Sequence, residues 1–441
     1  MKNFEKADII SKVAFNKNKA RFLPRTEQMK LNAAMKNKLL RFASEIAAEK
    51  ERPQTMKLID EMMNGMHGQR VKDLYNYRRE GNHVMALLCN SIPPEVVYGL
   101  GNFVPVSVCM GAGEVEPYAD EYTKGMCSVT RSMIGFLKTG MCVFFNLADH
   151  VLASDMCPTV KKAAEIIPQI SDEFELYCLE TNEKDGKLNV DVNGLKKWVA
   201  KITGSKGFDN KRLLKYARLF SDIRHEYKAI FSLRRHSNPP LNGKNGLWIQ
   251  QLALVEEPEK LLHVLKKLRR ELEENVKNNK GYNPNGTKKR VMLISPRIMP
   301  PFGEIYRLIE KCNALIVCEE IDMGITNIDY DFDHFAGLLG ENDAFPDKAL
   351  KYILESIDIT STSCVEEFDF QKIMNKVNNY GVDAVIAFSF KNCPVMWQKT
   401  KKICNLLEES GIPSKTVQSG YMEIYEQEEI FVEEIHNFLS P

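Results

Sequence analysis

Cysteine is the residue type best placed to do chemistry in this chain, and it recurs at wide intervals in one stretch. Five cysteines fall there at successive separations of 20, 18, 15 and 15 residues: Cys89, Cys109, Cys127, Cys142 and Cys157. The separations are too wide for a zinc knuckle, whose ligands come in closely spaced pairs. If the fold brings several of these soft thiolates together, an iron-sulfur cluster suits the site better than a hard cation does.

Short β-type runs supply the geometry that such a site needs. Cys89, Cys109 and Cys157 each close a run of this kind, and Cys393 closes another near the other end of the chain. In a parallel α/β sheet the carboxyl ends of the strands line one crevice, where ligands bind. The pattern therefore predicts two sheets whose cysteine-bearing edges meet.

Helix starts coincide with two of the same cysteines. A predicted helix begins at Cys127, and Pro158 opens another directly after Cys157, since proline at the first helical turn is a start signal. The helix dipole and free N–H groups lower a thiol pKa at such a position and favour metal binding. By contrast, we assign Cys312 and Cys404, inside predicted helices, to packing. Cys178, in the middle of a β-run, receives the same assignment.

Composition limits the class of protein. The 441 residues are 44% hydrophobic and 27% charged with a formal net charge of +1, so nothing indicates a nucleic-acid or membrane partner. No run of about 18 apolar residues and no signal peptide are visible, and we expect a cytoplasmic protein. Eleven cysteines in a reducing compartment then imply metal ligation or buried free thiols. For any single cysteine, the buried thiol is the simpler interpretation.

Changes in periodicity divide the chain into four parts. We predict a helical region over 1–80, an α/β domain over 81–235 that carries most cluster cysteines, a helical connection over 236–286 and a second α/β domain over 287–441. The turn-rich run 237–245 fits a helix connection and a loop ordered by a ligand equally well.

Familiar nucleotide and protease motifs are missing from the sequence. It contains no Walker-type loop, no G-x-G-x-x-G and no H-E-x-x-H. Spacing leaves a Cys-His-Asp hydrolase open, but that chemistry needs one cysteine and would not explain the edge placement of the other five.

Four segments resemble those of a known family. The segment around Cys127 is similar to its N-L-C-P-x-x-K-S motif, and Asp155–Lys162 is similar to T-T-C-D-x-K-K. Gly381–Cys393 resembles the strand after V-D-G-V that ends in a third cysteine, and Pro239–Gly243 resembles P-P-x-x-G. From about residue 70 to 435 the chain thus resembles the 2-hydroxyacyl-CoA dehydratase family, which includes benzoyl-CoA reductase subunits and double-cubane cluster proteins.

The resemblance implies a fold and a set of ligands. Two flavodoxin-like (Rossmann-like) domains would hold a 4Fe-4S cluster through Cys127, Cys157 and Cys393, with one iron open to a substrate oxygen or a hydroxide. The contexts of three more cysteines resemble those of the double-cubane branch, which would add a second cubane (8Fe-9S): Cys89, Cys109 and Cys142. Cys364 also matches a family position and is a reserve ligand.

Three differences from the family lie near the expected substrate pocket. Ser295–Gly303 replaces a C-P-x-G turn, Glu319–Gly324 replaces an E-N-C-T-G loop, and Pro158 replaces an aspartate. The fold and the cluster are expected to persist, whereas the resemblance does not name the substrate.

The resemblance also implies a function and partners. An ATP-hydrolysing iron-sulfur activator protein would pass a low-potential electron to this chain, which would act as a reductase or dehydratase on a small-molecule or acyl-CoA substrate. It would work as a homodimer or as a heterodimer with a paralogous subunit. The alternatives are a non-catalytic electron-transfer or supporting subunit, and a metal-free α/β binding protein whose thiols only pack.

Overall fold

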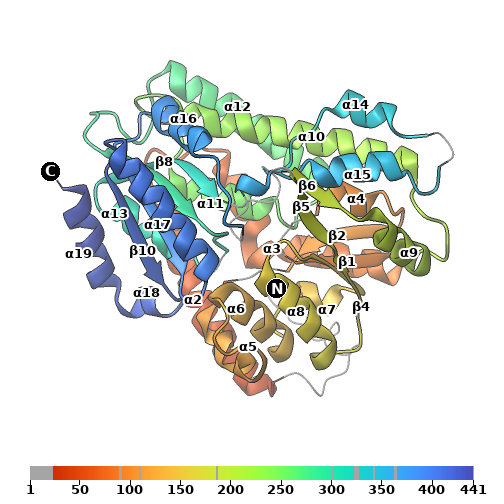
Figure 1. The fold of residues 1–441 in the computed structure, drawn as a ribbon. Coiled ribbons are helices and arrows are strands. Elements are labelled where there is room, and N and C mark those ends of the chain that lie inside the picture. The colour runs from red at the N-terminus through yellow and green to blue at the C-terminus, as the bar shows by residue number, and fades with distance from the viewer. Residues whose placement is uncertain are drawn as a thin grey trace.

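The computed structural model describes most of the chain. Its described residues are 23–88, 92–108, 111–184, 187–299, 302–321, 327–340, 343–361 and 365–440. Two four-stranded parallel sheets lie side by side with helices around them (Figure 1), so the predicted α/β class is confirmed. Cys89, Cys109 and Cys364 lie outside the described residues.

The first sheet comes from the first half of the chain. Its strands are β1 (His83–Leu87), β2 (Phe103–Ser107), β3 (His150–Ser154) and β4 (Glu175–Leu179). They lie in the order β2-β1-β3-β4, and every pair is parallel. The β-type runs predicted before three of the cysteines form β1, β2 and β3. A separate antiparallel hairpin, β5–β6, follows at 181–190.

The second sheet repeats this topology. Its strands are β7 (Lys289–Ser295), β8 (Ala314–Ile321), β9 (Ala384–Phe390) and β10 (Ser414–Ser419), in the order β10-β9-β7-β8. In both sheets the first strand has the second on one side and the third on the other, which is the flavodoxin-like order. Each sheet therefore changes winding direction between its first and third strands, where a crevice opens.

Both sheets are buried on two faces, as parallel sheets are. Along β1, Val84 and Ala86 belong to one core cluster and Met85 and Leu87 to another. The first cluster includes residues of α3 (Met56–Arg79), α6 (Ser128–Thr139) and α8 (Pro158–Ile170); the second includes residues of α4 (Pro94–Tyr98), α9 (Val192–Ile202) and α10 (Asn210–Ser232). The first cluster continues into β7 and β9, so one core joins the two sheets.

Two helices from the second half of the chain cross to the first sheet. α14 (Phe332–Gly337) and α15 (Asp347–Glu355) contribute Phe335 and Leu350 to the cluster that covers β1. Lys196 on α9 donates to Asp347 at 2.7 Å. The boundary predicted near residue 287 thus falls between the strands of the two sheets, while the helices that cover them interchange.

The described part of the predicted N-terminal helical region, from residue 23 on, contains α2 (Arg25–Ala47) and α3. α2 packs against the C-terminal part of the chain, where Arg41 pairs with Glu428 at 2.8 Å at the start of α19 (Glu428–Leu439). Phe42 of α2 lies close to Gly303, since a Cβ at that glycine would come within 2.6 Å of its ring. α2 therefore contacts both α19 and the segment before α13 (Glu304–Lys311).

The connection between the sheets is helical over most of its length. α10 is followed by η3 (Leu233–Arg235), α11 (Gly243–Leu252) and α12 (Pro258–Lys277). Within the turn-rich run 237–245, α11 already begins at Gly243. Asn242 caps α11 by accepting a hydrogen bond from the Asn245 N–H at 3.0 Å, and this cap starts a helix in spite of the glycines.

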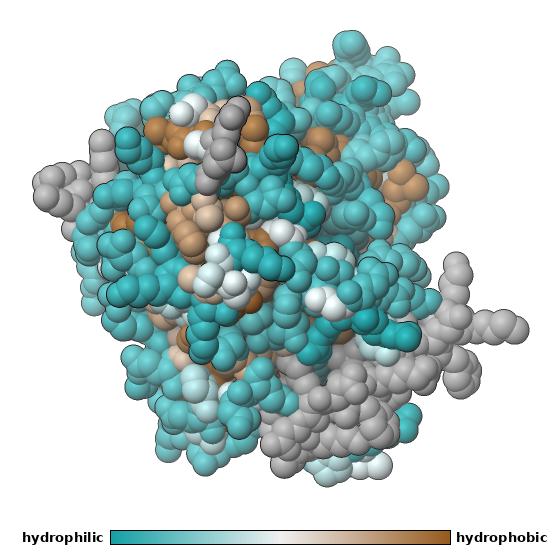
Figure 2. Space-filling view, turned by 90° about the vertical axis from the view of Figure 1, so that its right-hand side faces the viewer, coloured by the Kyte–Doolittle hydropathy of each residue, from teal (hydrophilic) through white to brown (hydrophobic). Residues whose placement is uncertain are grey.

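The face shown in Figure 2 is largely hydrophilic, with hydrophobic residues in separated groups. Within the described part of the chain, no helix combines the length and the hydropathy that crossing a bilayer requires.

Candidate functional site

Three of the predicted site residues occupy the same local position. Cys127, Cys157 and Cys393 are the N-cap residues of α6, α8 and α17 (Pro394–Glu409). Cys157 follows β3 and Cys393 follows β9, which are the third strands of the two sheets, and each precedes a proline at the first helical position. The two sheets thus present the same Cys-Pro helix start at equivalent places.

The structure brings these three cysteines together. The Thr159 hydroxyl oxygen lies 3.1 Å from the Cys157 sulfur and 3.6 Å from the Cys127 sulfur, so one side chain touches both. Cys393, from the other sheet, is close enough that both other thiols act electrostatically on it. Of the cysteines predicted to converge at strand ends, Cys157 and Cys393 come close to each other and to Cys127, whereas Cys89 and Cys109 lie outside the described residues.

The sequence predicts a lowered thiol pKa at a helix N-terminus, but at Cys127 the pKa is raised, because burial outweighs the helix dipole. Burial, and then the neighbouring Cys157, raises the pKa of Cys127, against smaller opposing effects of Thr130 and Thr159. Burial, followed by the other two cysteines, raises the pKa of Cys393 to about 12, opposed by the Met396 N–H. A bound metal would displace the thiol protons, because the thiolate is the ligand form.

Short polar contacts hold the two Cys-Pro turns. Before Cys157, the Asp155 carboxylate accepts hydrogen bonds from the Thr181 N–H at 2.8 Å and from its hydroxyl at 2.6 Å. Before Cys393, the chain turns at Asn392 with φ of 61°, a left-handed conformation that asparagine tolerates. The Cys393 N–H then donates to the Phe390 carbonyl at 3.3 Å. Both thiols are thus fixed to the ends of their strands.

Cys127 is positioned through its helix. Arg131 on α6 donates to Glu116 and to Asp120, both at 2.6 Å, which anchors the helix to the preceding segment. Gly135 faces that segment so closely that a Cβ there would lie 2.2 Å from the Val115 carbonyl oxygen. The first turn of α6 therefore has little freedom to move.

The carboxyl edges of the two sheets meet near this helix start. A Cβ at Gly111, after β2, would lie 2.6 Å from the Met299 carbonyl oxygen and 2.9 Å from the Tyr421 ring. A Cβ at Gly420, after β10, would lie 3.8 Å from the Ser128 hydroxyl next to Cys127. The three thiols therefore lie at the junction of the two halves of the molecule.

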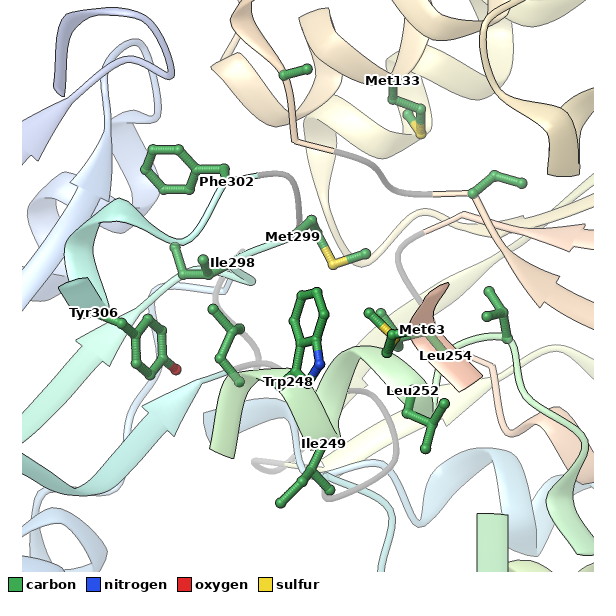
Figure 3. Packing of buried hydrophobic residues seen from close by; sticks show 14 of the residues in the cluster. Met63, Met133, Trp248, Ile249, Leu252, Leu254, Ile298, Met299, Phe302 and Tyr306 are labelled. Atoms are coloured by element: carbon green, nitrogen blue, oxygen red, sulfur yellow. The ribbon is translucent and has the colours of Figure 1, made fainter. Parts of the chain in front are cut away.

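Apolar side chains fill the neighbouring part of this junction. Met299 and Phe302, from the segment after β7, are almost fully buried in the main core cluster together with Trp248 and Met63. Figure 3 shows Met299 between Trp248 and Met133, with Phe302 beside it. This part of the junction is therefore apolar and closely packed.

Cys142 lies elsewhere. It caps the short helix α7 (Val143–Leu147), is fully buried and belongs to the main core cluster. α6 separates it from Cys127, and a helix of 12 residues is about 18 Å long. Cys142 therefore cannot share a single cubane with Cys127.

Among the described residues, no group of three or more His, Cys, Asp or Glu side chains is placed to hold one metal ion. The ligands of a single zinc all lie about 2.3 Å or less from it, whereas cluster thiolates bind different irons and stand further apart. The donor set at the junction is all sulfur, a composition that iron-sulfur clusters accept.

The remaining described cysteines are in packing environments. Cys312, Cys318 and Cys404 are buried, and Cys178 on β4 is half-buried against the main core. Burial raises the pKa of Cys318 to about 12 and those of Cys178 and Cys404 to about 11. None of them lies at a helix N-cap.

Sequence reasoning missed two hydroxyl side chains at the site. Besides Thr159, the Thr130 hydroxyl lies 3.4 Å from the Cys127 sulfur and is fully buried. Each threonine follows its cysteine by two or three residues, in the first turn of the same helix. The sequence signal for them was a threonine two or three residues after each N-cap cysteine.

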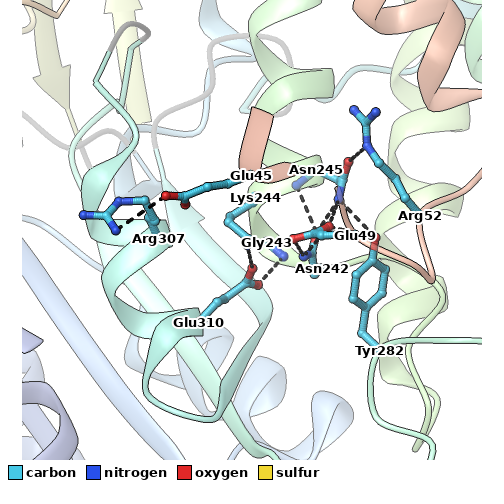
Figure 4. A network of polar contacts seen from close by, with 10 residues as sticks. All are labelled: Glu45, Glu49, Arg52, Asn242, Gly243, Lys244, Asn245, Tyr282, Arg307 and Glu310. Atoms are coloured by element: carbon cyan, nitrogen blue, oxygen red, sulfur yellow. Dashed lines mark hydrogen bonds and ion pairs between the residues drawn. The ribbon is translucent and has the colours of Figure 1, made fainter. Parts of the chain in front are cut away.

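The segment 237–245 makes contacts within the protein. Asn242 donates to the Glu49 carboxylate at 3.0 Å, Lys244 pairs with Glu49 at 2.6 Å, and the Gly243 N–H donates to Glu310 at 2.7 Å (Figure 4). Two protein carboxylates thus occupy the start of α11. Of the two interpretations left open, these contacts favour a packed helix connection.

Two doubly wound sheets with thiols at their facing edges form the arrangement that the resemblance to the 2-hydroxyacyl-CoA dehydratase family implies. More specifically, residues 89–439 match the family model of the 2-hydroxyglutaryl-CoA dehydratase D-component, and the chain belongs to that family. No curated protein matches the chain.

Proposed function

We propose that this chain is the iron-sulfur component of an ATP-driven 2-hydroxyacyl-CoA dehydratase or related reductase. The observation that carries the proposal is the meeting of Cys127, Cys157 and Cys393 at the junction of the two sheets. Family membership supports a dehydratase component, and the all-sulfur donor set supports a 4Fe-4S cluster.

In this proposal the chain holds and shields the cluster. When bound, the cluster supplies a low-potential electron and an iron position open to a substrate oxygen. The three thiols lose their protons on binding, and the N-termini of α6, α8 and α17 stabilise the resulting negative charge. The apolar packing around Met299 excludes water and strengthens these electrostatic interactions.

The proposal includes partners. The electron comes from an ATP-hydrolysing iron-sulfur activator protein, and the substrate is a small molecule or an acyl-CoA. The chain works as a homodimer or beside a paralogous subunit. A second cubane, giving a double-cubane cluster, would use Cys89, Cys109 and Cys142, with Cys364 in reserve.

One observation favours a second candidate, a non-catalytic electron-transfer or supporting subunit. The segment after β7, where the family has a C-P-x-G turn, is filled here by Ile298, Met299 and Phe302. At the end of β8, Glu319 pairs with Arg234 and Glu320 with Lys376, so these carboxylates already have partners. Buried apolar side chains and paired carboxylates are expected in loops that pack inside the protein and no longer bind a substrate.

Anaerobic purification with iron and sulfide counts and an EPR spectrum tests the cluster. About four irons per chain are expected for one cubane, and about eight for the double cubane. A colourless, iron-free protein would overturn the proposal and favour a binding protein whose thiols only pack.

Turnover separates the two candidate roles. If the chain, with only the ATPase and ATP added, converts 2-hydroxyacyl-CoA substrates, it is the catalytic component. An obligatory second large subunit, with no turnover in its absence, would assign the supporting role instead.

A further inference from the structure

Two threonine hydroxyls contact two of the three converging sulfurs. Thr159 is the second residue of α8, and its hydroxyl lies 3.1 Å from the Cys157 sulfur and 3.6 Å from that of Cys127. Thr130 is the third residue of α6, and its hydroxyl lies 3.4 Å from the Cys127 sulfur. Both threonines come from the first turn of a helix that a site cysteine caps.

The direction of these hydrogen bonds depends on the state of the sulfur. In the free thiols either partner can donate. A metal-bound thiolate has no hydrogen and can only accept, so both hydroxyls must then donate. Thr159 has one hydrogen for two sulfurs, and the shorter distance assigns it to Cys157. Thr130 then donates to Cys127, so the Cys127 and Cys157 sulfurs have one hydroxyl donor each.

The third cysteine differs. Within the described part of the chain, no side-chain hydroxyl contacts the Cys393 sulfur. Its pKa is raised mainly by burial and then by the other two thiols, and the Met396 N–H acts in the opposite direction. Among the described residues, hydroxyl donors therefore reach the site sulfurs only from α6 and α8, in the first half of the chain.

We propose that Thr159 and Thr130 are positioning residues that set the reduction potential of the cluster through hydrogen bonds to Cys157 and Cys127. The inference rests on the proposed function, since it requires the cluster to be bound. Donors to cluster sulfurs stabilise the reduced, more negative state, so the hydroxyls make the potential less negative. The chain would thus accept the electron from its partner more readily.

The test measures the midpoint potential of the anaerobic protein by EPR-monitored titration, with iron counts and thermal midpoints for each variant. Thr159→Val should shift the potential to more negative values, and Thr159→Ser should restore it. Thr130→Val should shift it in the same direction. The double variant should shift the potential further than either single variant, but not by the exact sum, because both hydroxyls lie within 3.6 Å of the Cys127 sulfur.

Thr139→Val is the matched control. Thr139 is also buried on α6, but its hydroxyl donates to the Gly135 carbonyl at 2.7 Å rather than to a sulfur. This variant should leave the potential unchanged. An equal shift in Thr139→Val would overturn the inference, because the effect would then come from packing.

The remaining outcomes separate this inference from the proposed function. Iron-free wild-type protein would overturn both. Full iron with an unshifted potential in Thr159→Val would overturn only the role of the hydroxyl. If Thr159→Val loses its iron, retention in Thr159→Ser would support the hydroxyl, and loss in both variants would overturn it.

Discussion

The carboxyl edges of the two sheets share the same Cys-Pro helix start, but they contribute different side chains to the site. Each third strand ends in a Cys-Pro helix start, Cys157 after β3 and Cys393 after β9. The first edge adds Cys127 and two hydroxyl donors, whereas the second adds the apolar side chains of the segment after β7. The first half thus supplies most of the polar chemistry, and the second contributes one thiol and a neighbouring apolar segment.

The largest expected effect tests whether both edges are needed. Cys157→Ser and Cys393→Ser should each lower the iron content of the anaerobic protein, because each removes one of three converging thiolates. Cys404→Ser is the control, since Cys404 lies on the same helix as Cys393 but in the core. Retention of full iron in Cys393→Ser alone would mean that the second sheet only covers the site.

The sequence predicted those parts of the site that follow from strand ends. β-type runs and helix-start signals were enough to place Cys157 and Cys393 at facing edges, because parallel sheets concentrate their strand ends in one crevice. Cys127 follows no strand, and its place depended on the predicted helix start and on the family resemblance.

Other features depend on tertiary packing and had no sequence signal. The crossing of α14 and α15 to the first sheet is decided by long-range burial of residues such as Phe335 and Leu350. α11 was obscured by its glycines, because its start depends on an asparagine cap and on a carboxylate from α13 (Glu304–Lys311), namely Glu310. Patterning within a short window cannot show such contacts.

Each half also contains a buried arginine whose partner can be removed. Arg224 donates to Glu95 at 2.7 Å in the first half, and Arg234 donates to Glu319 at 2.9 Å beside the second sheet. Glu95→Ala and Glu319→Ala should each lower the free energy of unfolding by about 3–5 kcal/mol, because each leaves a buried charge unpaired.

Urea unfolding of the two variants would show whether the halves tolerate this loss equally. Glu95→Ala should cost more, because Glu95 also accepts a hydrogen bond at 2.8 Å from Tyr330, which packs with α14 and α15. Glu259→Ala, in an exposed pair with Lys215, should cost less than about 1 kcal/mol. A loss of similar size in that control would show that pairing is not the cause.

A pH dependence is expected from the network that joins α2 to the second sheet. Burial raises the pKa of Glu310 to about 7, although Lys244 acts in the opposite direction. The folded state therefore binds the proton more tightly than the unfolded state, whose pKa is near the ordinary 4.5. The stabilising contribution is complete below that value and is lost as the pH rises through about 7.

Glu310→Gln should remove this dependence. The amide oxygen can still accept from the Gly243 N–H without carrying a charge, so the variant should gain on the order of 3 kcal/mol over wild type at pH 8 and little at pH 4. Urea midpoints across this range measure it. Glu165→Gln, on an exposed surface, should leave the pH profile unchanged. A parallel profile for Glu310→Gln and wild type would contradict the assignment.

The smallest expected effect concerns Cys142, the predicted ligand that lies apart from the other three. Packing and ligation make different predictions for its replacement. As a packed thiol, Cys142→Ala should cost about 1–2 kcal/mol in the free energy of unfolding, the same as Cys404→Ala, and both variants should keep all their iron. If Cys142 is instead a ligand of a second cubane, the Cys142→Ala protein should lose about half of its eight irons, while the EPR signal of the first cluster persists.

The fold limits which residues could bind a second cubane together with Cys142. Since α6 holds Cys142 and Cys127 at opposite ends, a second cubane on Cys142 would have its own ligands, and Cys89 and Cys109 are the predicted ones. Cys109→Ala should then reproduce the iron loss of Cys142→Ala, with Cys178→Ala as its core control. Equal stability losses with unchanged iron in all of these variants would leave Cys127, Cys157 and Cys393 as the ligands of a single cluster.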